Sequence, residues 1–343
     1  MDFTPTEEQE AVRSLATQLF ATATHPDTGI AGFDEALWAR LVEGGLLGLS
    51  VPEALGGGGL PLAVAAVVAE EAGRAAARVP VVPVLAGLSV LEDPELIAAV
   101  IAGEAIVVPA VGTNGWESRP RAQRDGQSWT ANGTLLAVAW GAEASHCVVA
   151  ARTADDAEVL LLVALADVER IEEQVSSREP HATLVLHNCP ARRLNGTAAE
   201  ALTRFTLLQC AYGVGVAEKS LELAAHHVST REQFGKPLAT FQAITYQVAD
   251  CWIDVEAMRL TMQQAVWRVD EGLPAAEETA IAAFWGADGI QRVVSKAVHL
   301  HGGMGVDVSY PLHRWFLIGK VLELSLGGAQ RSLEQLGNLL AAR

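Results

Sequence analysis

Near the amino terminus, apolar side chains recur at intervals of three and four residues, the spacing of an amphipathic helix. Thr4-Pro5-Thr6-Glu7 has the residue order of a helix start: an N-cap threonine, a proline at the first helical position and a capping-box glutamate. Further helices are predicted over 34–43 and 61–77, and Asp93-Pro94 repeats the cap-and-proline signal before a short one. Residues 1–104 are therefore predicted to form a helical domain.

From residue 105 the pattern changes to short apolar runs between Gly, Asn and Asp turns, which is typical of β strands. Asp125-Gly126 and Asn132-Gly133 are the clearest turn signals in this part of the chain. The runs that predict strands are 106–109, 129–131, 146–151, 159–166 and 183–187. We therefore expect a middle antiparallel β domain over residues 105–198.

Helical spacing returns at residue 199 and continues almost to the end of the sequence. Its longest part is an apolar stripe in steps of three and four residues, formed by Phe241, Ile244, Val248, Trp252, Val255, Met258, Met262, Val266 and Val269. Gly272 and Pro274 end this helix, and further helices are predicted over 275–298 and 322–340. Residues 199–343 are thus expected to form a bundle of helices.

Composition and charge narrow the classes of function. Half of the 343 residues are hydrophobic and 19% are charged, which excludes a disordered chain. The net charge is −17 and no basic cluster is visible, so no nucleic-acid partner is expected. A small polyanion such as a nucleotide or coenzyme A remains compatible with this charge. The apolar runs are too short for a membrane span and no export signal is visible, so we expect a cytoplasmic protein.

The metal and disulfide signatures of known sites are missing. The cysteines lie far apart in apolar stretches without a CxxC pair, which predicts reduced core thiols at Cys147, Cys189, Cys210 and Cys251. The histidine pairs His226-His227 and His299-x-His301 lack the spacing of a zinc site. Gly56 to Gly59 lacks the strand and lysine context of a P-loop, so a turn is expected there.

Two segments leave a functional and a structural interpretation open. His301-Gly-Gly-Met-Gly305 follows a predicted helix, and its glycines either let backbone amides approach a ligand or simply end the helix. Arg231-Glu-Gln-Phe-Gly235 places an arginine at a turn, where it either binds an anion or is an ordinary surface residue. Composition and periodicity alone do not decide between these interpretations.

The order of helical and β regions, together with four segments, resembles the acyl-CoA dehydrogenase family over essentially the whole chain. The segments are Ser50-Val-Pro-Glu-Ala-Leu-Gly-Gly-Gly-Gly-Leu60 with Glu70-Glu71, Asp125 to Thr134, Arg231-Glu-Gln-Phe-Gly-Lys-Pro-Leu with Phe241-Gln242 and Ala249-Asp250, and His301-Gly-Gly-Met-Gly with Tyr310 to Arg314. The resemblance implies a mainly α fold with an N-terminal helical domain, a middle antiparallel β domain and a C-terminal four-helix bundle.

The resemblance also implies an FAD-dependent enzyme that removes the α and β hydrogens of an acyl-CoA thioester and passes electrons to an acceptor flavoprotein. In this family the FAD site is shared between neighbouring subunits. The residues that match those holding the pyrophosphate and adenosine end of the neighbour's FAD are Arg231, Phe234, Gln242, His299, Gly302, Gly303 and Gly305. His299 stands where the family usually has a glutamine.

The chain departs from the family pattern at the positions that face the flavin ring. After Val107-Val108 the sequence runs Pro-Ala-Val-Gly-Thr-Asn-Gly115, without the family's TEP…GSD stretch. The positions of the family's flavin-facing Trp-[Ile/Val]-Thr strand are occupied by Ala137, Val138 and Ala139. Stacking and hydroxyl contacts to a flavin ring are therefore expected to be lost.

The catalytic base of the family is missing as well. The usual glutamate position falls on Gly327, or on Leu326 if the turn is shifted by one residue. A second subgroup keeps its base ten residues before the glycine equivalent to Gly215, which gives Phe205 here, and Thr206 replaces an arginine used near the substrate. No catalytic residue is therefore predicted in this chain.

These losses lie on one side of the site, which leads us to expect a non-catalytic partner subunit in a heteromeric, α2β2 acyl-CoA dehydrogenase. The chain resembles the short subunits of actinobacterial dehydrogenases that act on steroid side-chain CoA esters. The expected partners are a second family subunit, an acyl-CoA substrate and an electron-acceptor flavoprotein. Two alternatives stay open: an active homotetramer whose base is Glu218 or Glu323, and a non-enzymatic acyl-CoA-binding or assembly protein.

Overall fold

The computed structural model of the chain describes residues 3–23, 32–112 and 119–342. Within them the chain forms two compact units. The bundle unit comprises residues 3–23, 66–77 and 209–342, and the sheet unit comprises residues 32–65, 78–112 and 119–208. The order of helices, strands and helices along the chain is the one that the sequence predicts, while the domain limits at 104 and 198 stay a prediction.

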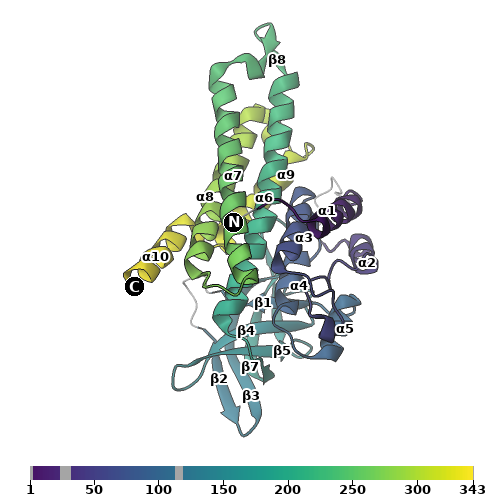
Figure 1. The fold of residues 1–343 in the computed structure, drawn as a ribbon, viewed down its shortest axis with the longest axis vertical. Coiled ribbons are helices and arrows are strands. Elements are labelled where there is room, and N and C mark those ends of the chain that lie inside the picture. Colours follow the sequence, from purple (N-terminus) through teal and green to yellow (C-terminus); the bar gives the residue numbers. More distant parts are fainter. Residues whose placement is uncertain (1–2, 24–31, 113–118, 343) are drawn as a thin grey trace. The chain divides into compact units, whose positions relative to one another are not determined.

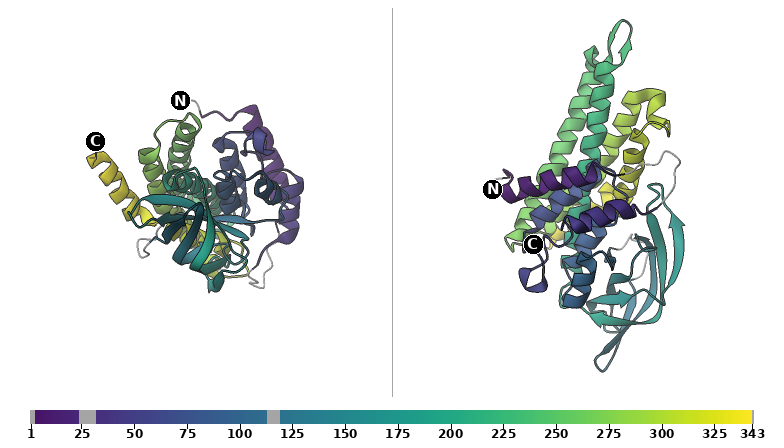
Figure 2. Two further views of the ribbon diagram at one scale, coloured as in Figure 1. Left: turned by 90° about the horizontal axis from the view of Figure 1, so that it is seen from below. Right: turned by 90° about the vertical axis from the view of Figure 1, so that its right-hand side faces the viewer.

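Long helices dominate the bundle unit (Figure 1). Its helices are α1 (Glu7–Phe20), most of α3 (Leu62–Arg74), most of α6 (Ala198–Thr230), α7 (Gln242–Asp270), α8 (Ala276–His301), α9 (Leu312–Ser325) and α10 (Gly328–Ala341). A small hairpin, β8 (Glu232–Gln233) and β9 (Lys236–Pro237), joins α6 to α7, which lie side by side in Figure 1 and in the right-hand view of Figure 2. Two 3-10 turns, η2 (Leu238–Thr240) and η3 (Gly302–Val306), follow β9 and α8.

Glycines let α3 and α6 approach closely within the bundle unit. A Cβ atom at Gly215 would lie 1.9 Å from the carbonyl oxygen of Glu70, and one at Gly73 would lie 2.0 Å from that of Tyr212. Because no side chain fits these spaces, the two helices pack backbone against backbone. This contact fixes Glu70 and Glu71 inside the unit, where both are buried.

The sheet unit combines short helices with a seven-stranded sheet. Its helices are α2 (Glu35–Glu43), the 3-10 turn η1 (Glu53–Leu55), α4 (Val81–Leu88) and α5 (Pro94–Ile101). Its strands are β1 (Val107–Ala110), β2 (Arg121–Asp125), β3 (Ser128–Ala139), β4 (His146–Arg152), β5 (Glu158–Ala164), β6 (Glu169–Gln174) and β7 (Pro180–Arg193). Their order is β1-β4-β2-β3-β7-β5, with β6 beside β7 and a further pairing of β4 with β5.

Most neighbouring strands of the sheet are antiparallel, as the sequence predicts, but not all of them. β4 runs parallel to β1 along its length and to β2 at one residue pair. The β2–β3 hairpin lies between β1 and β4 in the sequence, which gives the chain enough length to return in the same direction. The pairing of β4 with β5 joins β4, β2, β3, β7 and β5 into a ring.

Two of the predicted helix limits are wrong. The first helix is capped by Thr6 and not by Thr4: Gln9 N–H donates to the Thr6 hydroxyl at 3.3 Å, and Thr6 N–H donates to the Gln9 side chain at 2.9 Å. Near the carboxyl end, the single helix predicted over 322–340 is two helices. α9 ends before Gly327, whose φ of +84° is incompatible with a continuous helix.

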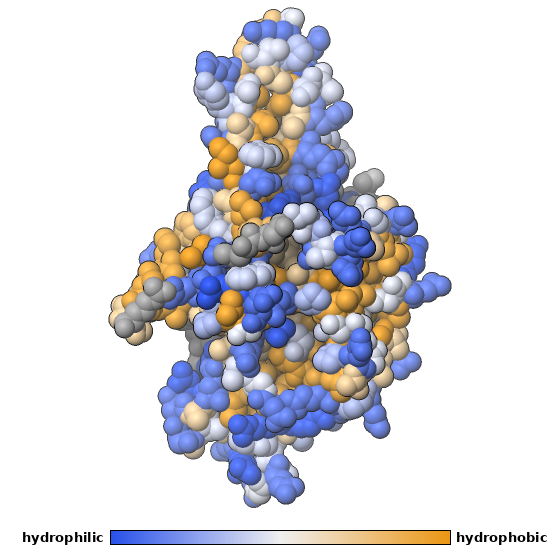
Figure 3. Space-filling model, viewed as in Figure 1, coloured by the Kyte–Doolittle hydropathy of each residue, from blue (hydrophilic) through white to orange (hydrophobic). Residues whose placement is uncertain are grey.

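The predicted stripe along α7 is confirmed in its inner part and wrong at Trp252. Val255, Met258 and Met262 are buried, whereas Trp252 is 59% exposed and its neighbour Cys251 is buried instead. Figure 3 shows apolar surface on the bundle helices. The large apolar side chains that α7 exposes are Tyr246, Trp252, Ile253 and Leu260.

All four cysteines are buried and carry free thiols. Burial raises the pKa of Cys147 and of Cys210 to about 12, so these thiols stay protonated and unreactive. None of the described helices combines the length and the apolar character needed to cross a membrane.

Candidate cofactor-binding surface

The α6–α7 hairpin holds the first group of candidate residues. Arg231 directly follows α6, where its N–H donates to the carbonyl oxygen of His227 at 2.8 Å and its carbonyl accepts from Leu238 N–H at 2.9 Å. The backbone of Arg231 is therefore fixed, while its side chain is exposed. Phe234, at the hairpin turn, has a positive φ of 57° and is 90% exposed. A bulky residue in this conformation is strained, which is typical of turns that serve a ligand.

Gln242 stands at the start of α7, beside the same turn. Its side-chain amide donates to the hydroxyl of Tyr246 one helical turn later. The ring of Phe234 meets the ring of Phe241 edge-on at 6.1 Å, and the ammonium of Lys236 lies 4.4 Å from the centre of the Phe241 ring. An arginine, an aromatic ring and an amide are thus presented together at one end of the bundle.

The second group lies where α8 ends. Gly302 has a φ of +60°, and a Cβ atom at Gly302 or at Gly303 would meet no atom within 4 Å. Gly305 is different, because a Cβ atom there would lie 2.5 Å from the carbonyl oxygen of Val298. Gly305 is therefore required by packing, whereas Gly302 and Gly303 leave backbone facing open space. His299, one turn earlier on α8, is exposed.

Buried contacts bring the two groups to the same end of the bundle. The ring of His227 on α6 stacks on the ring of His301 at the end of α8, with 4.3 Å between ring centres. Leu238 and Ile244 pack against an apolar cluster to which both α6 and α8 contribute: Ala224, Val228, Ala297, Leu300 and Leu312. Figure 1 shows β8 and the end of α8 at this end of the bundle.

The chemistry of this surface fits the adenosine diphosphate part of FAD. A guanidinium pairs with phosphate through charge-assisted hydrogen bonds, and backbone amides at exposed glycines can donate to an anion that approaches closely. Of the seven residues expected from the sequence to contact the cofactor, six are exposed and Gly305 alone is buried. They form an outward-facing surface and not the lining of an internal pocket.

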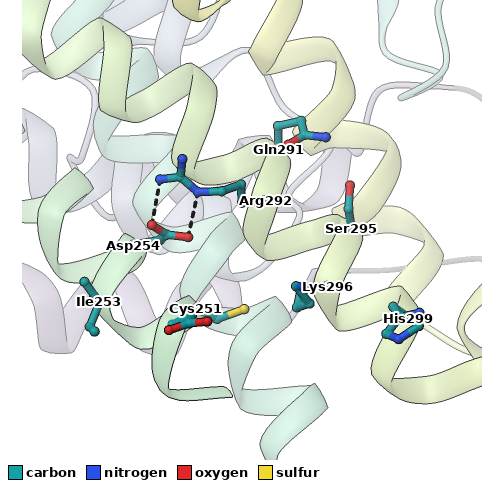
Figure 4. A pocket seen from close by; sticks show the side chains of 9 residues that line it. Cys251, Ile253, Asp254, Gln291, Arg292, Ser295, Lys296 and His299 are labelled. Atoms are coloured by element: carbon teal, nitrogen blue, oxygen red, sulfur yellow. Dashed lines mark hydrogen bonds and ion pairs between the residues drawn. The ribbon is translucent and has the colours of Figure 1, made fainter. Parts of the chain in front are cut away.

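A cavity of about 580 Å³ lies between α7 and α8 (Figure 4), and no motif in the sequence predicted it. His299 is the candidate cofactor residue that lines it. In its wall the Arg292 guanidinium donates to both carboxylate oxygens of Asp254, at 2.9 Å and 2.7 Å. A sequence signal for this cavity was available in two pairs of charged residues, each four residues apart: Asp250 and Asp254 on one helix, Arg292 and Lys296 on the other.

The positions at which the family carries its base hold no ionisable side chain. Gly327 lies between α9 and α10, and Leu326 is the C-cap residue of α9. A Cβ atom at Gly327 would lie 2.8 Å from Cδ of Arg331. Phe205 and Thr206 are half-buried residues of α6. None of these four residues can take a proton from a substrate.

The strand expected to face the flavin ring is irregular in this chain. Ala137 has a positive φ of 48°, and the pairing of β3 with β7 shifts register between Leu135 and Val138. The side chains of Ala137, Val138 and Ala139 offer neither an aromatic ring nor a hydroxyl. The other altered segment is described only to Gly112, since Thr113 to Gly115 lie outside the described residues.

The two alternative bases are engaged in ion pairs. The carboxylate of Glu218 lies 2.7 Å from Arg74 and 3.3 Å from Arg259. Glu323 pairs with Lys320 on the same helix. Both carboxylates are therefore occupied by basic side chains of this chain.

Comparison with known proteins places these observations in a family. Residues 6–93 match the family described as acyl-CoA dehydrogenase, N-terminal domain, and residues 196–340 match acyl-CoA dehydrogenase, C-terminal domain. Acyl-CoA dehydrogenase FadE27 of Mycobacterium tuberculosis is 34% identical over 370 residues, covering 99% of both chains.

Two solved structures are similar over nearly the whole chain. A structure described as the Tcur3481-Tcur3483 steroid ACAD G363A variant has a TM-score of 0.92 and 36% identity, covering 98% of both chains. The ChsE4-ChsE5 complex from Mycobacterium tuberculosis also has a TM-score of 0.92, with 32% identity and full coverage of both chains.

Proposed function

This chain belongs to the acyl-CoA dehydrogenase family, and we propose that it is a non-catalytic subunit that completes the FAD site of a second family member. The proposed reaction of the whole assembly is α,β-desaturation of an acyl-CoA thioester. Two similar structures support a heteromer that acts on a steroid CoA ester, which we propose to be a side-chain ester: one is a complex of two differently named chains, and the other is described as a steroid ACAD. An electron-acceptor flavoprotein is the proposed redox partner.

The observation that carries the proposal is an asymmetry between two parts of the site. The surface around Arg231 and Gly302 carries a guanidinium, a side-chain amide, an aromatic ring and open backbone glycines, and it faces outward. The positions that would serve this chain's own flavin ring and substrate, Gly327 and Ala137 among them, carry no functional side chain. A chain that clamps a neighbour's cofactor needs the first set and not the second.

In the proposed assembly this chain binds and orients, and the partner supplies the base. The Arg231 guanidinium would donate to the pyrophosphate, the backbone amides of Gly302 and Gly303 would lie beside it, and the exposed face of Phe234 would contact the adenosine end. FAD would supply the acceptor for the hydride of the β carbon. Because Ala137, Val138 and Ala139 offer neither an aromatic ring nor a hydroxyl to the flavin ring, the second subunit would hold that end.

Exposed apolar surface supports the presence of a second subunit. Tyr246, Trp252, Ile253 and Leu260 project from α7 without cover in the isolated chain. Such a row is unusual for the surface of a monomer, and a partner's helices would cover it. The active homotetramer is less well supported, because Glu218 and Glu323 are both engaged in ion pairs.

An absorbance spectrum of the purified protein tests the proposal. The chain expressed alone should be nearly colourless and prone to aggregation, whereas co-expression with a base-carrying family member should give a yellow heteromer with turnover. A homotetramer of this chain alone with one flavin per subunit would reject the proposal. A colourless, inactive heteromer would favour the acyl-CoA-binding or assembly role.

A further inference from the structure

Two buried histidines lie directly beneath the candidate cofactor-binding surface. His301, the last residue of α8, is 5% exposed, and His227, in the last turn of α6, is 9% exposed. Their rings stack with an interplanar angle of 21°. The Nδ1 atom of His301 lies 2.7 Å from the carbonyl oxygen of Ala297, and its Nε2 atom lies 3.1 Å from the hydroxyl of Tyr310.

These contacts define the protonation state of His301. A carbonyl oxygen only accepts hydrogen bonds, so the proton of the neutral ring is on Nδ1. The Nε2 atom is then the acceptor for the hydroxyl of Tyr310. A second proton on Nε2 would prevent this atom from accepting the hydrogen bond of the Tyr310 hydroxyl. It would also place a charged ring in a face-to-face stack with another imidazole.

The charged and titratable groups around the stack disfavour that second proton. His226 on α6 and Arg231 directly after it act on His227, and both are cationic when charged. Tyr310, which lies just before α9, contacts His301 through its hydroxyl. The ring of His313 on α9 is hydrogen-bonded to the backbone carbonyl of Tyr310. The segment from η2 to α7 packs four apolar side chains against the adjoining cluster: Leu238, Ala239, Ile244 and Val248.

Burial lowers the pKa of both His227 and His301, and for His227 the neighbouring His301, Arg231 and His226 lower it further. The folded stack therefore binds fewer protons than two exposed histidines do. Its stabilising contribution is fully present above the ordinary histidine pKa of about 6.5 and falls as the pH drops below that value.

The stack connects the two segments that the proposed function requires. Arg231 N–H donates to the carbonyl oxygen of His227, and Gly302 directly follows His301. We propose that His227 and His301 are positioning residues that hold Arg231 and the Gly302–Gly305 turn at a fixed spacing, and that protonation of the stack releases this spacing and the cofactor. The cofactor part of this inference rests on the proposed function, whereas the opening of the stack does not.

The first experiment measures flavin release from the heteromer between pH 7.5 and pH 5.5. We expect release to accelerate as the pH falls below 6.5, because protonation of the stack opens the spacing between the two segments. His227→Phe keeps an aromatic ring in the stack and removes its titration, so its release rate should vary less with pH. His187→Phe, at an exposed position on β7, is the matched control and should keep the wild-type profile.

The second experiment follows amide hydrogen exchange in the wild-type chain, at residues 227–241 and 300–310, corrected for the intrinsic effect of pH. Protection in both segments should fall together below pH 6.5, with or without flavin. If protection falls but the heteromer holds no flavin, the stack opens as inferred and the proposed function is wrong. The inference about the stack is wrong if flavin binds, protection does not fall below pH 6.5, and His227→Phe leaves the pH profile of flavin release unchanged.

Discussion

Gly305 and Gly303 stand two residues apart in one turn, yet they carry different constraints. A methyl group added at Gly305 would lie 2.5 Å from the carbonyl oxygen of Val298, whereas the space at Gly303 is empty. The glycine motif therefore contains one position required by packing and others that leave backbone open to a ligand. Sequence alone identifies the motif and does not separate these roles.

Gly305→Ala should destabilise the chain, because either the turn or the end of α8 must move to accommodate the methyl group. We expect a loss of about 1 to 3 kcal/mol in the free energy of unfolding, the usual cost of forcing an extra methylene into a packed site. Gly303→Ala is the matched control and should change stability by about 0.5 kcal/mol or less. Urea unfolding of both variants measures the difference, and equal stability of the two would contradict the packing at Gly305.

At the scale of helices and strands, the sequence predicts elements with a clear period and misses those without one. All eight residues of α4 are buried, so no polar face reveals its helical spacing. β2 and β6 are mostly polar and exposed, which hides them among turns. The cap of α1 lies at Thr6 and not at Thr4 because Gln9 completes a reciprocal pair there.

The candidate site was predicted only in part for a similar reason. Its motifs are local, so Arg231 and Gly302 could be found by residue order. The stack of His227 on His301 joins helices far apart in the sequence, and no local pattern reports such a contact. The cavity between α7 and α8 likewise depends on how two helices face each other.

A buried charge network ties three helices of the bundle unit together. Glu70 on α3 is 3% exposed and pairs with Arg259 on α7 and, at 3.2 Å, with Arg13 on α1. Glu71 lies 2.6 Å from Arg13. Buried carboxylates are tolerated only with such partners, so the network fixes how these helices meet.

Arg259→Ala should therefore cost more stability than the loss of a surface ion pair. Glu70 would keep Arg13 alone, and we expect a loss of about 2 to 4 kcal/mol, near the range for removing one partner of a buried pair. Arg152→Ala breaks the exposed pair with Asp156 and should cost about 1 kcal/mol or less. Chemical unfolding compares the stability of the two variants. A cost for Arg259→Ala no larger than for Arg152→Ala would mean that the buried carboxylate of Glu70 does not need Arg259 as a partner.

For the molecule as a whole, we expect a division of labour between subunits. The residues expected to reach a neighbour's cofactor are present, whereas Gly327, Ala137 and Thr206 stand at the positions expected for the base, a flavin-ring contact and the substrate-side arginine. A chain with one isolated defect would regain activity when that defect is repaired. A chain adapted to a partner would not.

Gly327→Glu tests this difference. The residue directly precedes α10 with a φ of +84°, a backbone conformation in which a glutamate is strained. We expect no acyl-CoA turnover above background when this variant is the sole subunit, because Ala137 and Thr206 still lack the needed groups. Turnover with any acyl-CoA would mean that the pocket is intact.

The flavin content of the Arg231→Ala heteromer decides whether the FAD site is shared. Loss of a charged hydrogen bond to a largely buried pyrophosphate should cost about 2 to 3 kcal/mol, or about thirty- to two-hundredfold in flavin affinity. Arg231 is not among the apolar side chains that α7 exposes for a partner, so the complex should keep its size. Arg121→Ala, which changes an exposed arginine on β2, serves as the matched control with normal flavin. We expect a heteromer of normal size that has lost FAD and turnover together. Unchanged flavin content and rate in that heteromer would show that Arg231 is an ordinary surface residue and would contradict the shared site.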